Sequence, residues 1–231
     1  MGTNTTHAGN VAMLKNLPYD PVKDFAPVMR TVTTAMVLLV KPDFPAKDVT
    51  QFLDYAKTHP NLTAGYGSGA SQISVGQLQS RGRPVGDRGV LPRCAAGGHR
   101  RDDRAINLTF ADLLLAVPQM QGGTLRGIGV TSAKRSELIP ALPALAEAIP
   151  GFEATIWYGL LAPANTSSAV VDKLYAESEK FLTMPATKEK LANVGVTVST
   201  MPPKEFGAFI QSEIVRWTAD AKAAGNRTPI N

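Results

Sequence analysis

Three polar residues close to the N-terminus, Thr3, Asn4 and Thr5, could bind an anion. They lie where a short predicted strand gives way to a helix predicted over residues 8–17. Backbone N–H groups at the start of a helix, helped by the helix dipole, form an anion site that needs no lysine or arginine. Threonine and asparagine at this position also cap helices without any ligand. The residues alone leave ligand binding and helix capping equally open.

A second run, at residues 66–71, repeats this arrangement. It follows a strand predicted at 62–66 and precedes a helix predicted from residue 72. Glycines let the backbone approach a ligand closely, and serine hydroxyls add further polar contacts. The run is not a P-loop, because no Gly-Lys-Ser/Thr follows, and Ser68 is not centred in the Gly-x-Ser-x-Gly of a nucleophile elbow. The candidate binding residues here are Tyr66, Gly67, Ser68, Gly69 and Ser71.

Catalytic and metal chemistry find little support in the sequence. A hydrolase that uses Ser68 is the enzymatic alternative, but it would need a base beside that serine. The three histidines, at positions 7, 59 and 99, are far apart and lack a partnered acidic or cysteine motif. The single cysteine, Cys94, can form neither an internal disulfide nor a metal site. We therefore expect no enzyme, no metal site and no cofactor.

The predicted elements that would position these residues alternate between strands and helices. With 231 residues, 44% of them apolar and 19% charged, the chain has the composition of an ordinary globular protein. The longest aliphatic run, Met36–Val40, has the length of a buried strand and is too short to span a membrane. Alternation of this kind favours an α/β fold with parallel-type sheets. The predicted strands are 32–40, 62–66, 107–110, 126–130 and 156–162, and the predicted helices are 8–17, 45–57, a helix from 72, 111–121, 143–149, 167–182, 186–194 and 206–225.

The net charge of +5 is concentrated in one stretch, residues 79–105. Seven arginines and three aspartates lie there, which leaves only +1 for the rest of the chain. A basic character so local does not indicate a nucleic-acid partner. An Arg- and Gly-rich stretch with few β-branched or aromatic residues cannot repay the entropy of ordering it, so we expect a poorly packed loop.

The run from Thr124 to Trp157 contains Thr-Ser-Ala-Lys-Arg-Ser at 131–136 and Pro-Gly-Phe-Glu-Ala at 150–154. This run resembles the extracytoplasmic substrate-binding proteins of tripartite tricarboxylate transporters, the Bug family. Further blocks of similar sequence occur in the same order and spacing at 16–28, 65–69, 159–164 and 206–225.

This resemblance implies a two-lobed, periplasmic-binding-protein-like (type II) α/β fold with a ligand in the cleft. The first lobe would comprise residues 1–34 and 157–231, and the second residues 35–156. Compared with the family, the chain is expected to be truncated, with an incomplete first lobe that lacks about a quarter of the mature protein. A signal peptide is also expected to be missing, since no apolar export core is present near residue 1.

Residues 79–105 depart from the family pattern. Reading each codon one base later permits the family residues in the right order, so an out-of-frame translation between two compensating shifts is our hypothesis. A divergent basic loop is the alternative. The agreement with the family resumes in frame at Ile106.

The resemblance implies a receptor that captures a small carboxylate and delivers it to membrane permease subunits. It would act as a monomer in the periplasm, although the chain as written would remain cytoplasmic. Asp112 matches a family position where an aspartate faces the ligand, and capping of a helix is the alternative role. A fragment of such a receptor without activity is the second functional hypothesis, and a hydrolase that uses Ser68 is the third.

Overall fold

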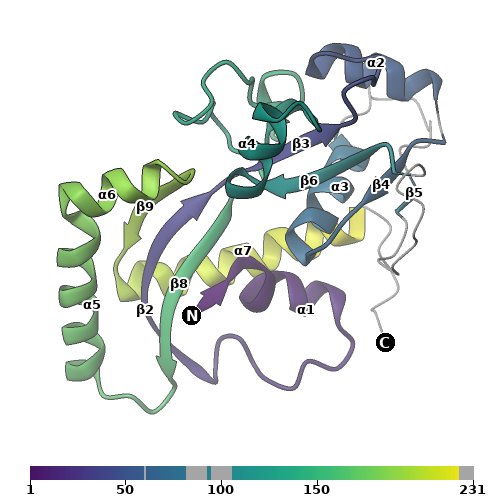
Figure 1. The fold of residues 1–231 in the computed structure, drawn as a ribbon. Helices are drawn as coiled ribbons and strands as arrows, with labels where there is room; N and C mark the ends of the chain where they lie inside the picture. Colours follow the sequence, from purple (N-terminus) through teal and green to yellow (C-terminus); the bar gives the residue numbers. More distant parts are fainter. Residues whose placement is uncertain (60, 82–92, 95–105, 224–231) are drawn as a thin grey trace. The chain divides into compact units, whose positions relative to one another are not determined.

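The computed structural model describes residues 1–59, 61–81, 93–94 and 106–223 (Figure 1). The chain divides into two compact units, each with its own sheet. Unit 1 consists of Met1–Thr34 and Ile156–Asn231, and unit 2 of Ala35–Thr155. None of the helices in the described ranges has the length and apolar content that a membrane span requires.

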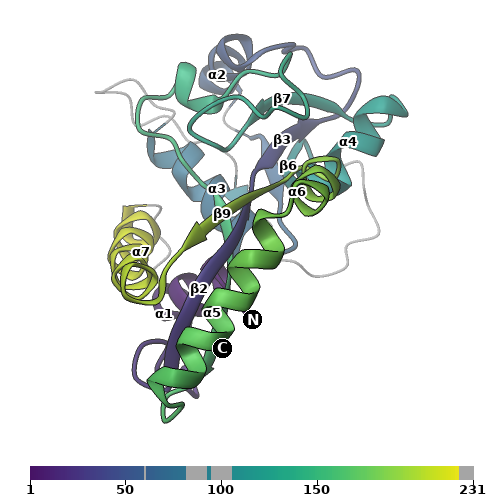
Figure 2. The ribbon, with the colours of Figure 1, turned by 90° about the vertical axis from the view of Figure 1, so that its left-hand side faces the viewer.

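Unit 1 contains a four-stranded antiparallel sheet in the order β1-β8-β2-β9. Helices α5 and α7 flank β2 on opposite sides, as Figure 2 shows. Helix α6 follows α5 and contacts β9. Two short helical turns, η1 and α1, follow β1. The bounds are β1 (Gly2–Thr3), η1 (Thr5–Gly9), α1 (Asn10–Met13), β2 (Phe25–Thr34), β8 (Ile156–Pro163), α5 (Ser168–Thr183), α6 (Pro185–Ala192), β9 (Val196–Met201) and α7 (Pro203–Ala223).

Each face of this sheet has its own apolar cluster because side chains alternate along a strand. On the α7 side, Trp157 of β8 packs with Phe206 and Ile210, which recur at helical spacing. On the α5 side, Val28 and Ala162 pack against Val171. This second cluster is small.

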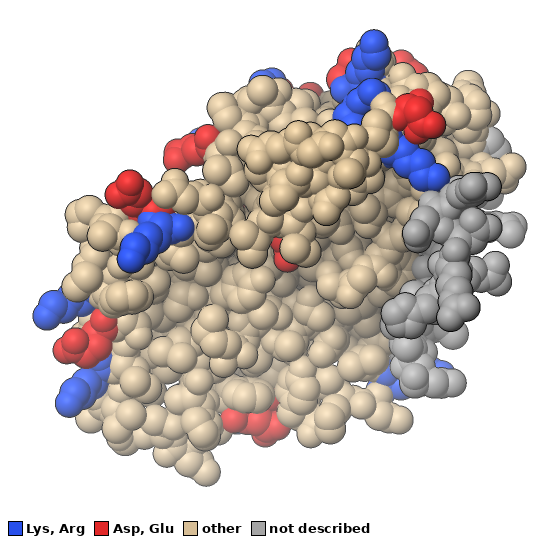
Figure 3. All heavy atoms as spheres, in the orientation of Figure 1, with Lys and Arg blue, Asp and Glu red and all other residues tan. Residues whose placement is uncertain are grey.

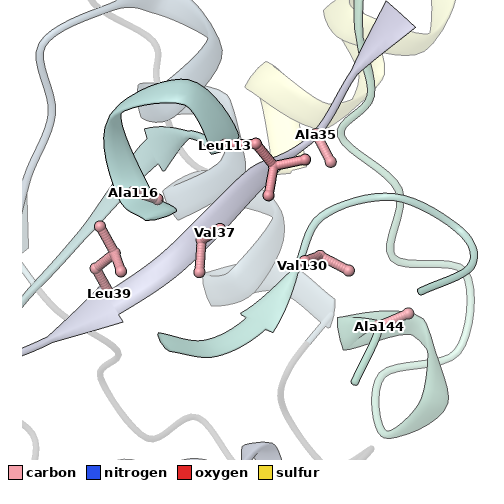
Figure 4. Packing of buried hydrophobic residues seen from close by; sticks show 7 residues of the cluster. All are labelled: Ala35, Val37, Leu39, Leu113, Ala116, Val130 and Ala144. Atoms are coloured by element: carbon pink, nitrogen blue, oxygen red, sulfur yellow. The ribbon is translucent and has the colours of Figure 1, made fainter. Parts of the chain in front are cut away.

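Unit 2 contains a five-stranded mixed sheet in the order β5-β4-β6-β3-β7. Strand β3 is buried along its whole length, and it pairs antiparallel with its two neighbours, β6 and β7. Figure 4 shows the cluster in which side chains of β3, β7 and α4 meet. The bounds are β3 (Met36–Val40), α2 (Val49–Thr58), β4 (Thr63–Gly65), α3 (Gly69–Arg81), β5 (Arg93–Cys94), β6 (Leu108–Asp112), α4 (Leu113–Gln121), β7 (Arg126–Val130) and the 3-10 turn η3 (Leu145–Glu147).

The expectation of parallel-type sheets is wrong for most of the strand pairs. Among the named strands of the described chain, only the two pairings of β4, with β5 and β6, are parallel. The remaining pairings are antiparallel, and several join strands that are far apart in the chain, such as β2, which carries the chain out of unit 1, and β8, which returns it. Neighbours in a sheet are therefore distant in sequence, which local alternation does not reveal.

Several predicted elements change their limits. The strand predicted at 32–40 is two strands, β2 and β3, which belong to different sheets and are separated at Ala35. β2 also extends back through Pro27, where its pairing with β8 is irregular and the missing N–H of proline is tolerated. The helix predicted at 143–149 is only the short η3 turn, and strand β9 was not predicted.

The predicted loop over residues 79–105 is wrong where the structure describes that segment. Residues 79–81 continue helix α3, and Arg93 and Cys94 pair in parallel with Thr63 and Ala64. Strand pairing uses backbone groups, so an unusual set of side chains does not prevent it. The rest of this segment and Gly225, the predicted end of the last helix, lie outside the described residues.

Candidate ligand-binding turns

The first candidate turn, in unit 1, is closed by its own side chains. The Thr3 N–H donates to Thr6 Oγ1 at 2.9 Å, and the Thr6 N–H donates to Thr3 Oγ1 at 3.2 Å. Asn4 is buried, and its Oδ1 accepts from the Thr5 N–H at 3.1 Å. The capping alternative is therefore realised here: these side chains satisfy backbone N–H groups at the start of η1.

A buried histidine lies directly behind this turn. His7 Nδ1 is 2.9 Å from Thr6 Oγ1, and the ring packs edge-on against Phe25 with 4.9 Å between the ring centroids. His7 Nε2 has no hydrogen-bond partner among the described residues. Gly2 permits this packing, because a Cβ atom there would come within 2.7 Å of the His7 ring. From the sequence, His7 is one of three histidines far apart in the chain; its position directly after Thr6 is the signal that relates it to the turn.

The second candidate turn, in unit 2, connects β4 to helix α3. Ser71 Oγ accepts from the N–H groups of Gly67 and Ser68 at 3.2 and 3.0 Å. In return, the Ser71 N–H donates to Ser68 Oγ at 3.2 Å. Ser71 is buried, whereas Gly67 and Ser68 are exposed. Here too the hydroxyls cap a helix, and the exposed backbone of Gly67 and Ser68 is the part that a ligand can reach.

The position of Asp112 relates it to the second turn. Strands β4 and β6 run parallel, with Gly65 opposite Thr109. Tyr66 follows the last residue of β4, and Asp112 is the last residue of β6, so both lie at the carboxyl ends of adjacent strands. Asp112 ends β6, whereas the helix predicted at 111–121 begins one residue before it. It occupies the N-cap position of α4, but its side chain makes no capping hydrogen bond. Partial burial raises the pKa of its carboxyl group above the usual value.

Neither turn contains an arginine, lysine or cysteine. Across the described ranges, no three histidine, cysteine, aspartate or glutamate side chains are grouped closely enough to hold a metal ion. The hydroxyl of Ser68 is hydrogen-bonded to Ser71 and, within the described residues, to no histidine. The geometry is thus suited to hydrogen bonding of a polar ligand by backbone and hydroxyl groups.

Comparison with known proteins identifies the family. The model of the tripartite tricarboxylate transporter family receptor matches residues 1–83 and 95–225. The family model leaves residues 84–94 unmatched. This interval lies inside the segment 79–105 that departs from the family pattern, and it is shorter than that segment. The UPF0065 protein of the tcbD-tcbE intergenic region in Pseudomonas sp. strain P51 is 30% identical over 210 residues. BugT of Bordetella pertussis is 24% identical over 226 residues.

Two solved structures share the fold. Rpa4515 of R. palustris, determined with adipate, has a TM-score of 0.83 and 27% identity, covering 97% of this chain and 76% of that one. MatC from Rhodopseudomonas palustris, determined with bound malate, has a TM-score of 0.75 and 26% identity, covering 95% of this chain and 77% of that one.

The matched region includes nearly all of this chain but only part of its relatives. It covers 87% of this chain and 61% of the Pseudomonas protein, and 94% of this chain and 68% of BugT. Both candidate turns and Asp112 lie within the residues that the family model matches. The chain therefore belongs to the family of tripartite tricarboxylate transporter receptors.

Proposed function

We propose that this protein is an extracytoplasmic receptor that binds a small carboxylate and presents it to the membrane subunits of a transporter. The observation that carries the proposal is the family match together with two solved relatives determined with dicarboxylates, adipate and malate. Units 1 and 2 are proposed to be its two lobes. Binding leaves the ligand chemically unchanged.

The two turns are proposed to contact the carboxylate groups. Each lies at a strand-to-helix junction, where N–H groups and the helix dipole attract negative charge. Thr3, Asn4 and Thr5 belong to the turn in unit 1, and residues 66–71 to the turn in unit 2. The Gly67 and Ser68 N–H groups donate to the neutral Ser71 Oγ at 3.2 and 3.0 Å. A charged carboxylate oxygen is a stronger acceptor and could replace this hydroxyl.

Asp112 is proposed to face the same ligand. A carboxyl group that is partly buried and does not cap its helix is available to accept from a ligand hydroxyl or amine, or from a bound water molecule. Its negative charge would repel a second ligand carboxylate. We therefore expect Asp112→Asn to tighten binding of a fully ionised dicarboxylate that lacks any donor group, such as adipate.

Isothermal titration with adipate, malate and acetate tests the proposal, and Gly67→Ala is its most informative variant. A Cβ atom at Gly67 meets nothing within 4 Å, so this substitution should leave the fold and the melting temperature unchanged. A methyl group there would nevertheless obstruct a carboxylate that approaches the turn. We expect a dicarboxylate to bind and Gly67→Ala to weaken it at least about tenfold, which corresponds to about 1.4 kcal/mol.

The other outcomes of these experiments distinguish the remaining functional hypotheses. If no carboxylate binds at millimolar concentration, the chain on its own is a fragment without receptor activity. If binding occurs but Gly67→Ala retains it, the turn in unit 2 is not the site. Ester hydrolysis that disappears in Ser68→Ala would instead make the protein an enzyme.

A further inference from the structure

Thr131, in unit 2, is a fully buried polar residue that directly follows strand β7. Its N–H donates to the Met36 C=O, and its Oγ1 accepts from the Met36 N–H, both at 2.9 Å. Its C=O accepts from the Ala154 N–H at 2.9 Å, and its hydroxyl donates to the Ala154 C=O at 3.0 Å. The polar groups of Thr131 therefore join two chain segments, one at Met36 and the other at Ala154.

The hydroxyl of Thr131 completes the strand ladder where the backbone leaves it. In an antiparallel pair, residues in a hydrogen-bonded position exchange N–H and C=O groups. Val37 lies opposite Val130 in the pairing of β3 with β7, so Met36 comes next to Thr131. The Thr131 C=O binds Ala154 instead, and Oγ1 takes its place as the acceptor for Met36. A hydroxyl accepts one hydrogen bond and donates another, which an apolar side chain of the same size cannot do.

The segment that Thr131 holds also fixes the position of Asp112. Met36 is opposite Asp112 in the antiparallel pairing of β3 with β6, and the Leu113 N–H donates to the Ala35 C=O at 3.2 Å. Both backbone groups of Met36 are directed at Thr131, so Met36 and Asp112 form a pair without mutual hydrogen bonds. In such pairs the side chains of opposite residues lie closest together.

The surroundings of Asp112 are apolar. Met36 is 1% exposed and lies on the same face of the sheet as Asp112. Helix α4, which begins directly after Asp112, contains no charged residue, and the surface over it is almost entirely uncharged on the face shown in Figure 3. Burial is the cause that raises the pKa of the Asp112 carboxyl group. Displacement of Met36 would admit water and return this pKa towards its ordinary value.

We infer that Thr131 is a positioning residue for the Asp112 carboxyl group and, through it, for the ligand. The second part rests on the proposed function, in which Asp112 faces the ligand. The Thr131 hydroxyl holds the backbone at Met36, and that backbone holds Asp112 at the end of β6. Without the hydroxyl, the buried Met36 N–H and Ala154 C=O lose this partner, and the segment is free to shift.

Thr131→Val, which removes the hydroxyl and keeps the size of the side chain, tests the inference without any ligand. NMR titration of isotope-labelled aspartate carboxyl carbons gives the Asp112 pKa, with the signal assigned by its loss in Asp112→Asn. We expect this pKa to fall by about 0.5 or more in Thr131→Val and to stay close to its original value in Thr131→Ser. Thr124→Val makes the same change at an exposed position of unit 2 and is the matched control. An Asp112 pKa that does not change in Thr131→Val overturns the inference.

Isothermal titration with malate and adipate shows whether Thr131 acts through Asp112. Malate has a hydroxyl that can donate to a carboxylate and adipate has none, so the ratio of their dissociation constants reports on the Asp112 contact. We expect Thr131→Val to reduce the preference for malate by about fivefold or more, but by less than about twofold in the Asp112→Asn background. Equal reductions in the two backgrounds overturn the inference. If neither acid binds the unmodified protein, the proposed function fails, and the NMR titration still decides the role of Thr131.

Amide exchange in the unmodified protein provides a test that does not require Thr131→Val to fold. Leu114, 57% exposed in the first turn of α4, is the reference, because the first N–H groups of a helix have no partner within it. After correction for intrinsic rates, we expect the N–H groups of Met36 and Leu113 to exchange at least about tenfold more slowly than that of Leu114. Exchange at Met36 as fast as at Leu114 would show that the Thr131 hydroxyl does not hold this segment, and the inference would be wrong.

Discussion

Glu213 is a buried carboxylate at the centre of unit 1 that apolar periodicity does not reveal. Its side chain is 5% exposed, and Oε2 accepts from the indole N–H groups of Trp157 and Trp217 at 3.0 and 3.2 Å. Oε1 pairs with the Arg216 guanidinium at 2.8 Å. Burying a charge is tolerated only with such partners. Glu213 therefore joins β8 to α7 through a polar network inside an apolar interface.

Replacing Glu213 should destabilise unit 1. Glu213→Ala removes the acceptor for two buried indole N–H groups and leaves Arg216 without this partner, so we expect a loss of about 2–4 kcal/mol. Glu213→Gln keeps an acceptor oxygen and should lose less. Urea unfolding followed by tryptophan fluorescence measures both, with Val215→Ala on the exposed side of the same helix as control. Equal losses for Ala and Gln would argue against the indole contacts.

His7 should make stability depend on pH. Burial, reinforced by the positive N-terminus, lowers the pKa of His7 below its ordinary value. In the unfolded chain the pKa is about 6.5, so between the two values the unfolded state binds more protons. Stability should therefore be highest above about pH 7 and should fall as pH falls through 6.5 towards the folded pKa.

Urea midpoints at pH 7, 6 and 5 measure this dependence. The variant His7→Gln should show a smaller decline than the unmodified protein over this range. As control, His59→Gln removes an exposed imidazole at the end of α2. A decline that is unchanged in His7→Gln would show that other groups are responsible.

At the scale of elements, local sequence signals are most reliable where a helix end is capped by neighbouring residues. Asp48 lies directly before α2, and its Oδ1 accepts from the Gln51 N–H at 2.8 Å. Asp48→Ala should cost about 1 kcal/mol and lower the melting temperature by about 2–4 °C. Asp48→Asn should cost little. Asp54→Ala, which removes an exposed ion pair with Lys57 in the same helix, is the control.

Strand partners, in contrast, could not be predicted. The limits of β7 agree with the sequence pattern, because its short aliphatic run is bounded by turn residues. β2 and β3 were merged, because β-branched and aliphatic residues continue through Ala35 while the chain passes from one sheet to another. Periodicity measures how a segment is buried, and it does not identify which strands lie beside it.

At the scale of the whole molecule, each unit has its own core. Leu39 is 1% exposed within the cluster of Figure 4, and Leu39→Ala should cost about 2–5 kcal/mol. We expect hydrogen exchange to accelerate more in unit 2 than in unit 1, because local stability follows local packing. Leu115→Ala, at a 63% exposed position, is the control. Equal acceleration in both units would mean that they unfold together.

Part of the candidate site could be predicted from the sequence. The turns at Thr3 and Tyr66 were found because small polar residues and glycines interrupt apolar segments at strand-to-helix junctions. Helix capping was an open alternative for the turn at Thr3 and was not predicted for the turn at Tyr66, since hydroxyl orientation depends on the folded backbone. The helix predicted from residue 111 begins two residues too early, and only the pairing of β6 with β3 shows that Asp112 ends a strand. Its side chain does not cap α4.

The sequence by itself determined the family, the α/β class, the two polar turns and the apolar face of α7, because each depends on residues close together in the chain. Only the tertiary structure decided that most strands pair antiparallel, that Glu213 and His7 are buried, and that the Thr131 hydroxyl joins Met36 to Ala154. These features arise where segments that are not neighbours in the sequence, such as β2 and β8, come into contact. Such contacts depend on how the whole chain packs, which local spacing does not encode.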